Sequence, residues 1–284
     1  MVVVHLTNGF GNNMFQYIAG RLLAQYHNQD LVCKPYTSNY YAVDSLKAVG
    51  VTNIETGREL LEKHYGQFIQ VNDDNYQTYF DSNWKTGDFY LEGYFEDYRF
   101  YYDNIDVIKS WFPKIDKRND NDLVLHFRTG DRLFMKNEFY TKPRIENYIN
   151  AISRFNFDKL HIVTDFPEWK RVTADELSSM NQNFHHPVAP ADSVPIEDSV
   201  KFINEMIDGL DKFEPNVQKR TISDDFNFIR SFNNILFEHG TLSWWAAVLS
   251  DAQKVGVYKN WRPFKGSSNK NLSQIPLDSW FGWE

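Results

Sequence analysis

The first 35 residues place a short apolar run, a glycine-containing turn and a helical pattern in immediate succession. Val2–Leu6 is almost entirely apolar, and Gly9 and Gly11 follow in the turn. Apolar residues then recur at helical spacing over about 14–26, and a second apolar run begins at Leu31. A strand that is apolar on both faces is typical of a parallel sheet covered by helices. This order predicts a β-α-β unit and therefore an α/β fold.

The later part of the chain repeats this alternation of strands and helices. Its apolar runs are predicted strands at 89–95, 123–127, 160–164, 234–237 and 255–258. Helices are expected over 97–112, from Asp224–Asp225 as caps through Phe232, and over 242–249. The polar stretch 113–122 begins with a proline and is the expected linker between two domains.

Composition excludes several classes of function. The chain of 284 residues has a net charge of −8, which argues against a general binder of nucleic acid or of anionic membranes. A single cysteine permits no internal disulfide and fits a reducing compartment. The amino-terminal residues lack a basic segment, and no apolar run approaches 18 residues, so neither a signal peptide nor a membrane span is expected. We expect a cytoplasmic protein.

In parallel sheets, ligands bind beyond the carboxyl ends of the strands. The first loop at such an end contains Gly9 and Gly11, which let backbone amides approach a phosphate, although the same glycines could serve only a tight turn. A dinucleotide-binding loop needs a third glycine, where this chain has Met14. An NAD-dependent oxidoreductase is therefore disfavoured.

The second loop carries His126 and Arg128 on one face of a predicted strand end. The planar guanidinium of Arg128 suits a diphosphate, which it can hold through two charge-assisted hydrogen bonds. The alternative is an ion pair between Arg128 and Asp131 that only ties down the loop.

The third loop runs from Gly240 into an apolar helix through Thr241, Ser243 and Trp244. Hydroxyls and free amides at a helix start can cradle an anion. The alternative is a simple N-cap by Thr241 or Ser243 with tryptophans buried behind it. No histidine pair has the spacing of a metal site, so no metal is expected.

These segments together resemble glycosyltransferase family 11, the α-1,2-fucosyltransferases. The resemblance covers most of the chain, from Leu6 to about Trp261, and rests on segments that occur in the family's order. They are LTNGFGNNMFQY at 6–17, YLEGYF at 90–95, HFRTGD at 126–131, VTD at 163–165 and LSWWAA at 242–247.

The resemblance implies a GT-B-like α/β fold, with two Rossmann-type domains of mainly parallel sheets facing a central cleft. We expect an acceptor-side domain at 1–115, a donor-binding domain at 120–262 and an aromatic tail at 263–284. The implied activity is inverting, metal-independent transfer of fucose from GDP-fucose to a glycan acceptor, at O2 of a galactosyl unit. No cofactor is implied, because the GDP-sugar is a co-substrate.

Carried over position by position, the resemblance places Arg128 on the β-phosphate and His126 on the nucleotide. The remaining donor-binding candidates are Gly9, Gly11, Asn12, Asp225, Thr241, Ser243 and Trp244, with Asp225 on the guanine edge. Asp131 and Glu138 are the candidate general bases.

Thr129 stands where the family usually has a second arginine. This departure leaves open a transferase for another GDP-sugar, such as GDP-rhamnose or GDP-mannose. A non-catalytic glycan- or nucleotide-binding protein on the same scaffold is the other alternative.

Overall fold

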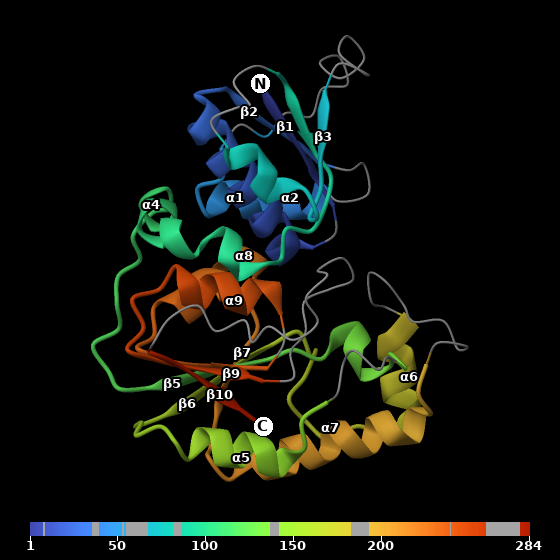
Figure 1. The fold of residues 1–284 in the computed structure, drawn as a ribbon. Helices are drawn as coiled ribbons and strands as arrows, with labels where there is room; N and C mark the ends of the chain where they lie inside the picture. Colours follow the sequence, from blue (N-terminus) through green and yellow to red (C-terminus); the bar gives the residue numbers. More distant parts are fainter. Residues whose placement is uncertain are drawn as a thin grey trace.

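The computed structural model describes most of the chain in separate stretches. They are residues 1–7, 9–35, 40–52, 54, 68–81, 87–136, 142–182, 193–238, 240–259 and 279–284. The described residues form two parallel sheets with helices packed against each, so the chain has two Rossmann-like α/β domains (Figure 1). The fold class predicted from the sequence is confirmed.

The first domain is built on a four-stranded parallel sheet in the order β2-β1-β4-β3. Its strands are β1 (Val2–Leu6), β2 (Leu31–Pro35), β3 (Ile69–Val71) and β4 (Phe89–Leu91). Its α-helices are α1 (Phe10–His27), α2 (Tyr40–Ala48) and α4 (Ile105–Ser110), and 3-10 turns lie at Tyr76–Phe80, Tyr98–Phe100 and Tyr102–Asn104. Because β1 lies inside the sheet, its apolar residues are buried along nearly its whole length.

The second domain contains a six-stranded parallel sheet in the order β10-β9-β8-β5-β6-β7. Its strands are β5 (Leu123–Phe127), β6 (Leu160–Thr164), β7 (Asn216–Gln218), β8 (Asn234–Phe237), β9 (Lys254–Tyr258) and β10 (Trp280–Trp283). Its helices are α5 (Ile145–Ile152), α6 (Ala174–Gln182), α7 (Ile196–Asp211), α8 (Ile222–Arg230) and α9 (Thr241–Val248), with a 3-10 turn at Gly130–Leu133. The chain order reverses between β5 and β8, where doubly wound sheets bind ligands.

The last residues of the chain belong to this second sheet. The sequence predicts an aromatic tail at 263–284, yet Trp280–Trp283 pairs in parallel with Val255–Tyr258 of β9. Trp280 and Trp283 are buried by this pairing. The aromatic residues therefore complete the edge of a sheet.

The segment after β4 turns earlier than the sequence suggests. The expected strand over 89–95 ends at Leu91, because the Asp73 carboxylate accepts the backbone N–H groups of Tyr94 (2.9 Å) and Phe95 (2.6 Å). Phe95 has a φ of 54°, which a strand does not adopt.

The expected helix over 97–112 is also only partly formed. The Asp97 carboxylate accepts the Arg99 N–H at 3.1 Å and binds the guanidinium of the same residue. Such local hydrogen bonds compete with the helix, which begins only at Ile105.

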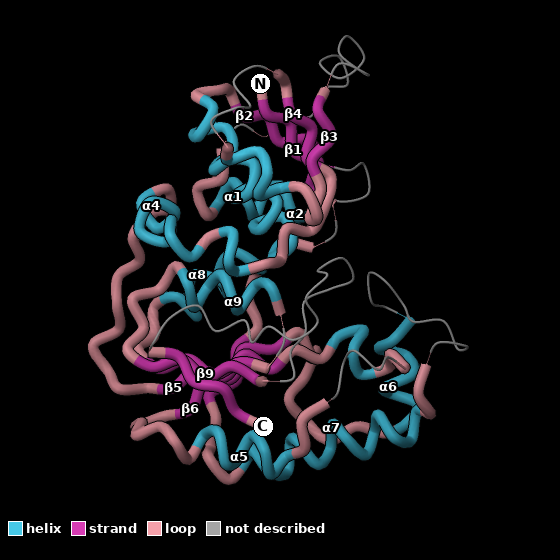
Figure 2. The backbone as a smooth tube through the Cα atoms, in the orientation of Figure 1, coloured by secondary structure: helices cyan, strands magenta, loops and turns pink. Residues whose placement is uncertain are grey.

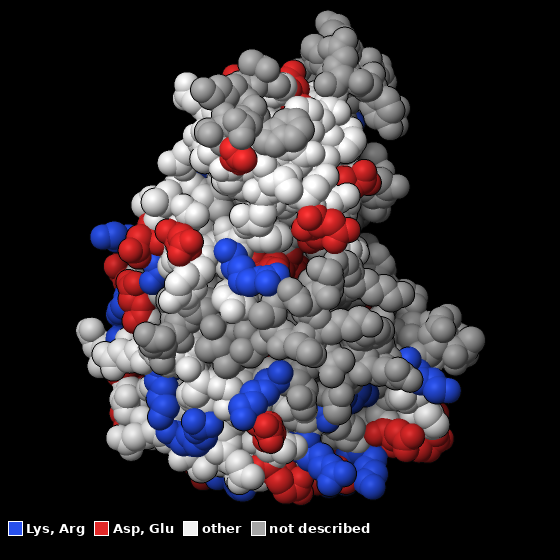
Figure 3. All heavy atoms as spheres, viewed as in Figure 1, with Lys and Arg blue, Asp and Glu red and all other residues white. Residues whose placement is uncertain are grey.

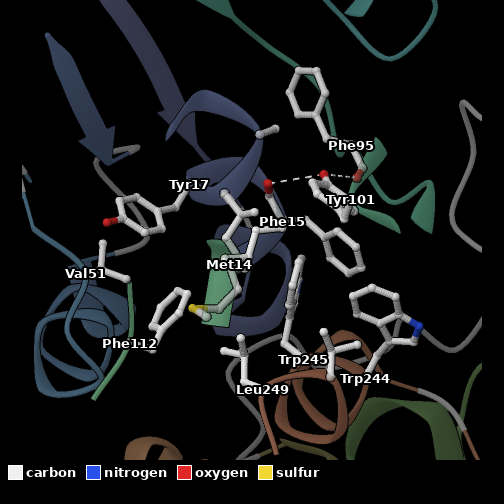
Figure 4. Packing of buried hydrophobic residues seen from close by; sticks show 14 of the residues in the cluster. Met14, Phe15, Tyr17, Val51, Phe95, Tyr101, Phe112, Trp244, Trp245 and Leu249 are labelled. Atoms are coloured by element: carbon white, nitrogen blue, oxygen red, sulfur yellow. Dashed lines mark hydrogen bonds between the residues drawn. The ribbon is translucent and has the colours of Figure 1, made fainter. Parts of the chain in front are cut away.

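One apolar cluster joins the two domains (Figure 4). The ring of Phe15 on α1 lies 5.0 Å from Trp244 and 4.9 Å from Trp245 on α9, centroid to centroid, and all three side chains are buried. Phe10 meets Phe226 of α8 edge-on at 5.1 Å. Helices α8 and α9 thus form a layer between the second sheet and the first domain (Figure 2). Where α1 meets this layer, the boundary between the domains is filled with side chains.

Gly11 lies at the closest approach of α1 to α9. A Cβ atom added there would lie 2.3 Å from both the Leu242 backbone nitrogen and Thr241 Oγ1. We expect Gly11→Ala to lower the free energy of unfolding in urea by about 1–3 kcal/mol, the usual effect of overpacking.

Gln25→Ala, at an exposed position of the same helix, is the matched control and should change this free energy by less than about 0.5 kcal/mol. Two variants of equal stability would contradict the close approach of the helices.

Candidate functional site

Three loops that stand out in the sequence meet at the carboxyl edge of the second sheet. Strands β5 and β8 are parallel neighbours, so the loop after His126 lies beside the turn at Gly240. A Cβ atom on Gly240 would lie 3.7 Å from His126 Cε1 and 3.9 Å from Arg128 Cδ. Helix α1 joins them because Thr241 Oγ1 donates a hydrogen bond of 2.7 Å to Asn12 Oδ1. The sequence motifs that lie far apart in the chain are therefore brought together.

The amino ends of α1 and α9 face each other at this junction. The first hydrogen bonds inside the two helices run from Asn13 N to Gly9 O and from Trp244 N to Gly240 O, both at 3.0 Å. The amides that precede Asn13 and Trp244 have no acceptor within their own helices and carry the positive ends of the helix dipoles. Gly240 has a φ of 132°, which favours glycine at this turn. The arrangement can bind an anion.

Ser243 and Trp244 contribute to this turn from the inside. Ser243 is buried, and its Oγ donates to the Gly240 carbonyl at 3.1 Å, so its hydroxyl fixes the helix start. Trp244 is buried against Phe15 and packs the apolar cluster. Trp244, which the sequence predicts to contact the donor, therefore lies in the apolar core.

A buried polar network fixes the loop after β1. Asn13 Nδ2 donates to the Thr7 carbonyl at 2.6 Å, and the Thr7 N–H donates to Gln16 Oε1 at 2.9 Å. Gln16 Nε2 reaches the Gly93 carbonyl at 2.8 Å, which connects the loops after β1 and β4. Gln16 is not among the candidates from the sequence, and the signal that could have identified it is an amide within an apolar helix face.

Arg128 lies at the rim of the junction with 35% of its side chain exposed. Its guanidinium is 3.6 Å from Asp131 Oδ1, so the ion pair considered from the sequence is present. Both side chains are partly exposed, so the pair adds at most about 1 kcal/mol to stability. The pair instead orients the guanidinium. Glu138, the second candidate base, lies outside the described residues.

Thr129 is anchored by the loop that follows β6. Asp165 Oδ1 accepts hydrogen bonds from the Thr129 N–H at 2.7 Å and from its hydroxyl at 2.8 Å. Gly130 follows with a φ of 41°, and a Cβ atom there would lie 2.5 Å from Asp165 Oδ2. These hydrogen bonds join the ends of the neighbouring strands β5 and β6. They also fix the backbone turn at Thr129.

His126 is an uncharged group at neutral pH. Burial lowers the pKa of its imidazole to about 4, and the positive charges of Arg128 and Arg132 act in the same direction. The carboxylates of Asp165 and Glu238 oppose this shift but do not reverse it. His126 can therefore act here only as a neutral hydrogen-bonding group.

Asp225 lies on the first turn of α8. Thr221, rather than Asp224 or Asp225, is the N-cap of this helix and accepts the Asp224 N–H at 3.2 Å. The Asp225 carboxylate accepts a hydrogen bond from the backbone of Arg220, and the guanidinium of Arg220 is 3.9 Å away. Burial raises the pKa of Asp225 to about 6. The backbone N–H and the charge of Arg220 oppose this shift, and the smaller effects of Asp224 and Asp165 add to it.

A small pocket of about 20 Å³, room for one or two water molecules, lies beside Arg128. Among the described residues it is lined by Arg128, Thr129, Arg132, Leu133, Lys142, Phe202 and Glu238. Lys142 Nζ donates to the Leu133 carbonyl at 2.6 Å, and burial lowers the pKa of this lysine to about 8. Neither Lys142 nor Glu238 is among the candidates from the sequence. The position of Glu238 directly after β8 is the signal that could have identified it.

Other kinds of site are not evident in the described parts of the chain. Among these residues no three His, Cys, Asp or Glu side chains form a group that could hold a metal ion. In the same residues no helix is both long and apolar enough to cross a membrane. On the face in Figure 3, basic and acidic side chains are interspersed over the second domain.

Comparisons with known proteins give similarity at the level of structure alone. No known family model matches the chain, and no curated protein sequence matches it. The α-1,6-fucosyltransferase NodZ soaked with GDP-fucose matches with a TM-score of 0.40 and 10% identity over 89% of this chain and 93% of that one. An Arabidopsis thaliana FUT1 mutant in complex with GDP matches with a TM-score of 0.46 and 9% identity over 93% and 70%.

Because the pKa of His126 is low in the folded chain, the free energy of unfolding should fall as the pH is lowered. Between pH 6.5 and about 4 the unfolded chain binds a proton at this position and the folded chain does not. His126 should therefore reduce the free energy of unfolding as the pH falls through this window, by up to about 3 kcal/mol. Urea denaturation should show a smaller loss between pH 7 and pH 5 for His126→Asn than for the unsubstituted chain. Parallel losses in the two proteins would contradict the burial of a neutral imidazole.

Proposed function

We propose that this protein is a glycosyltransferase that binds a GDP-sugar at the junction of α1, α9 and the loop after β5. The proposed reaction is metal-independent, inverting transfer of fucose from GDP-fucose to a hydroxyl of a glycan, at O2 of a galactosyl unit. The observation that carries the proposal is the meeting of Arg128 with two helix amino ends at the strand-order reversal of the second sheet. The sequence resemblance supports the choice of donor and acceptor.

The junction has the groups that a diphosphate requires. The planar fork of Arg128 can hold phosphate oxygens through two charge-assisted hydrogen bonds. Amides at the starts of α1 and α9 add donors, and the missing side chain at Gly9 lets the phosphates approach the backbone. Gly11 is instead covered by Thr241 and Leu242 of α9. Thr241 and Asn12 already bond each other, which holds the two amino ends in fixed register.

In the proposed reaction the acceptor hydroxyl oxygen attacks the anomeric carbon of β-linked fucose. The new carbon–oxygen bond forms on one face while the bond to the β-phosphate oxygen breaks on the other, and that oxygen keeps the electron pair. The transition state resembles an oxocarbenium ion, and negative charge grows on the departing GDP. Arg128 and the helix amides stabilise that charge, and one such donor is typically worth about 2.7–4 kcal/mol.

The acceptor hydroxyl also has to lose its proton. A carboxylate that accepts it typically contributes about 10²–10⁴-fold in rate. Asp131 and Glu138 are the candidates from the sequence. Asp131 is within 3.6 Å of Arg128 in the structure, which supports a role in orienting the guanidinium as well.

The Asp225 carboxylate is proposed to accept the two N–H donors of the guanine edge. Since its pKa is about 6, we expect the affinity for GDP to fall about tenfold between pH 7.5 and pH 5, as the carboxyl becomes protonated. Isothermal titration calorimetry with GDP and UDP at both values measures this.

We expect Asp225→Asn to bind GDP weakly at both pH values, and UDP to bind weakly to every form. Asp208→Asn, an exposed control on α7, should bind GDP like the unsubstituted chain. Equal affinity for GDP and UDP would overturn the guanine assignment.

A transfer assay with a galactoside acceptor tests the reaction itself. We expect Arg128→Ala to lose at least about 100-fold in kcat while unfolding at the same temperature, because it removes a donor to the leaving group. Arg171→Ala, at an exposed residue that precedes α6 and pairs with Asp208 of α7, is the control. Transfer should continue undiminished in EDTA.

Near-normal turnover by Arg128→Ala, or a strict need for Mn²⁺, would contradict the mechanism. The Thr129–Asp165 contact favours a second candidate, transfer from another GDP-sugar, because no second guanidinium is present at this position. GDP-mannose and GDP-rhamnose belong in the same assay, and donor binding without hydrolysis or transfer would instead indicate a non-catalytic binding protein.

A further inference from the structure

The indole of Trp283 contacts the end of a strand that is not its neighbour in the sheet. Trp283 lies in β10, is 3% exposed and pairs with Tyr258 of β9. Its Nε1–H donates a hydrogen bond of 3.2 Å to the carbonyl of Phe237, the last residue of β8. Because β9 separates β10 from β8, this side chain reaches across the end of β9. It therefore holds the point at which β8 ends.

The strand end that Trp283 holds leads directly into the proposed diphosphate site. Phe237 is followed closely by Gly240, whose carbonyl accepts the first hydrogen bond of α9, from Trp244 N at 3.0 Å. Phe237 also pairs with His126 of β5, which lies just before Arg128. A displacement of the Phe237 carbonyl would therefore move the amino end of α9 relative to the guanidinium.

The ring of Trp283 also supports the end of the next strand, β5. Its centroid lies 5.1 Å from that of Tyr148 on α5, and Tyr148 meets Phe127 edge-on at 5.7 Å. Phe127 is the last residue of β5 and directly precedes Arg128. Tyr148 and Phe127 are fully buried, and close-packed interiors transmit displacements from one side chain to the next. One indole thus supports two strand ends.

A diphosphate site depends on such support because its donors come from separate elements. Arg128 follows β5, whereas the amides of α9 follow β8. Groups in a binding site have to be held within about 0.5 Å of their productive positions. We propose that Trp283 is a positioning residue that fixes Arg128 relative to the amino end of α9 and so sets the affinity for a nucleoside diphosphate. This inference rests on the proposed function.

Trp283→Phe tests the hydrogen bond, because phenylalanine keeps an aromatic ring and lacks the N–H donor. We expect this variant to bind GDP about tenfold more weakly by calorimetry, the scale of one hydrogen bond lost at a buried carbonyl. Tyr148→Leu interrupts the ring contacts between Trp283 and Phe127 and should show a loss of the same order, so the test does not depend on a single variant. Thermal unfolding identifies a temperature at which every variant is folded, and calorimetry is done there.

Phe281→Leu is the matched control on the same strand. The ring of Phe281 packs against Phe155 at 5.4 Å and lies 3.8 Å from the Arg154 guanidinium, and neither residue belongs to a strand end at the site. We expect this variant to unfold at a lower temperature and to bind GDP like the unsubstituted chain. A merely structural role of Trp283 would give the same pattern for Trp283→Phe, with a lower unfolding temperature and unchanged affinity.

Hydrogen exchange in the absence of GDP provides a measurement that does not depend on the proposed function. We expect Trp283→Phe to speed the exchange of the backbone amides in 240–248 several-fold, because the end of β8 no longer fixes the start of α9. Phe281→Leu should leave the exchange in this segment unchanged.

Unchanged GDP affinity or unchanged exchange in Trp283→Phe would overturn the positioning role and leave the proposed function standing. An equal loss of affinity in Phe281→Leu would do the same. Failure of the unsubstituted chain to bind GDP would overturn the proposed function and this inference together.

Discussion

The packing of Phe15 against Trp244 and Trp245 holds the two halves of this molecule together. Aromatic pairs of this kind contribute about 0.5–1.5 kcal/mol each beyond their buried area. Tyr101 extends the contact, with its ring centroid 5.3 Å from Trp245. The contact sets the direction and height of α1 over α9, and only with that placement can Asn12 reach Thr241. The geometry at the amino ends of the helices is thus a consequence of apolar packing one turn further along.

The candidate site shows how a chain with a net charge of −8 can still present positive potential at one place. Arg128, Arg132 and Lys142 are gathered around the end of β5, and the backbone amides of two helices add to them. The burial of His126 keeps that imidazole neutral at neutral pH. Fixed dipoles and a few charges in a partly dry site stabilise developing charge more effectively than mobile surface charges in water.

Much of the architecture can be read from the sequence, because its signals are local. Apolar runs such as Val2–Leu6 and Leu123–Phe127 predict buried parallel strands, and the order of strands and helices predicts where their loops meet. Non-local contacts decide the rest. No alternating pattern in the sequence predicts that Trp280–Trp283 pairs with β9. The turn at Phe95 depends on the carboxylate of Asp73, which is 22 residues away.

The contact between Asn12 and Thr241 joins residues that are 229 positions apart. A ribosome adding roughly 5–20 residues per second needs on the order of tens of seconds to cover that distance. During this interval the face of α1 that carries Phe10 and Phe15 has no α8 or α9 to cover it. The amino-terminal half of a nascent chain therefore emerges with an exposed apolar face on α1. That face is buried only after the carboxyl-terminal half has been synthesised.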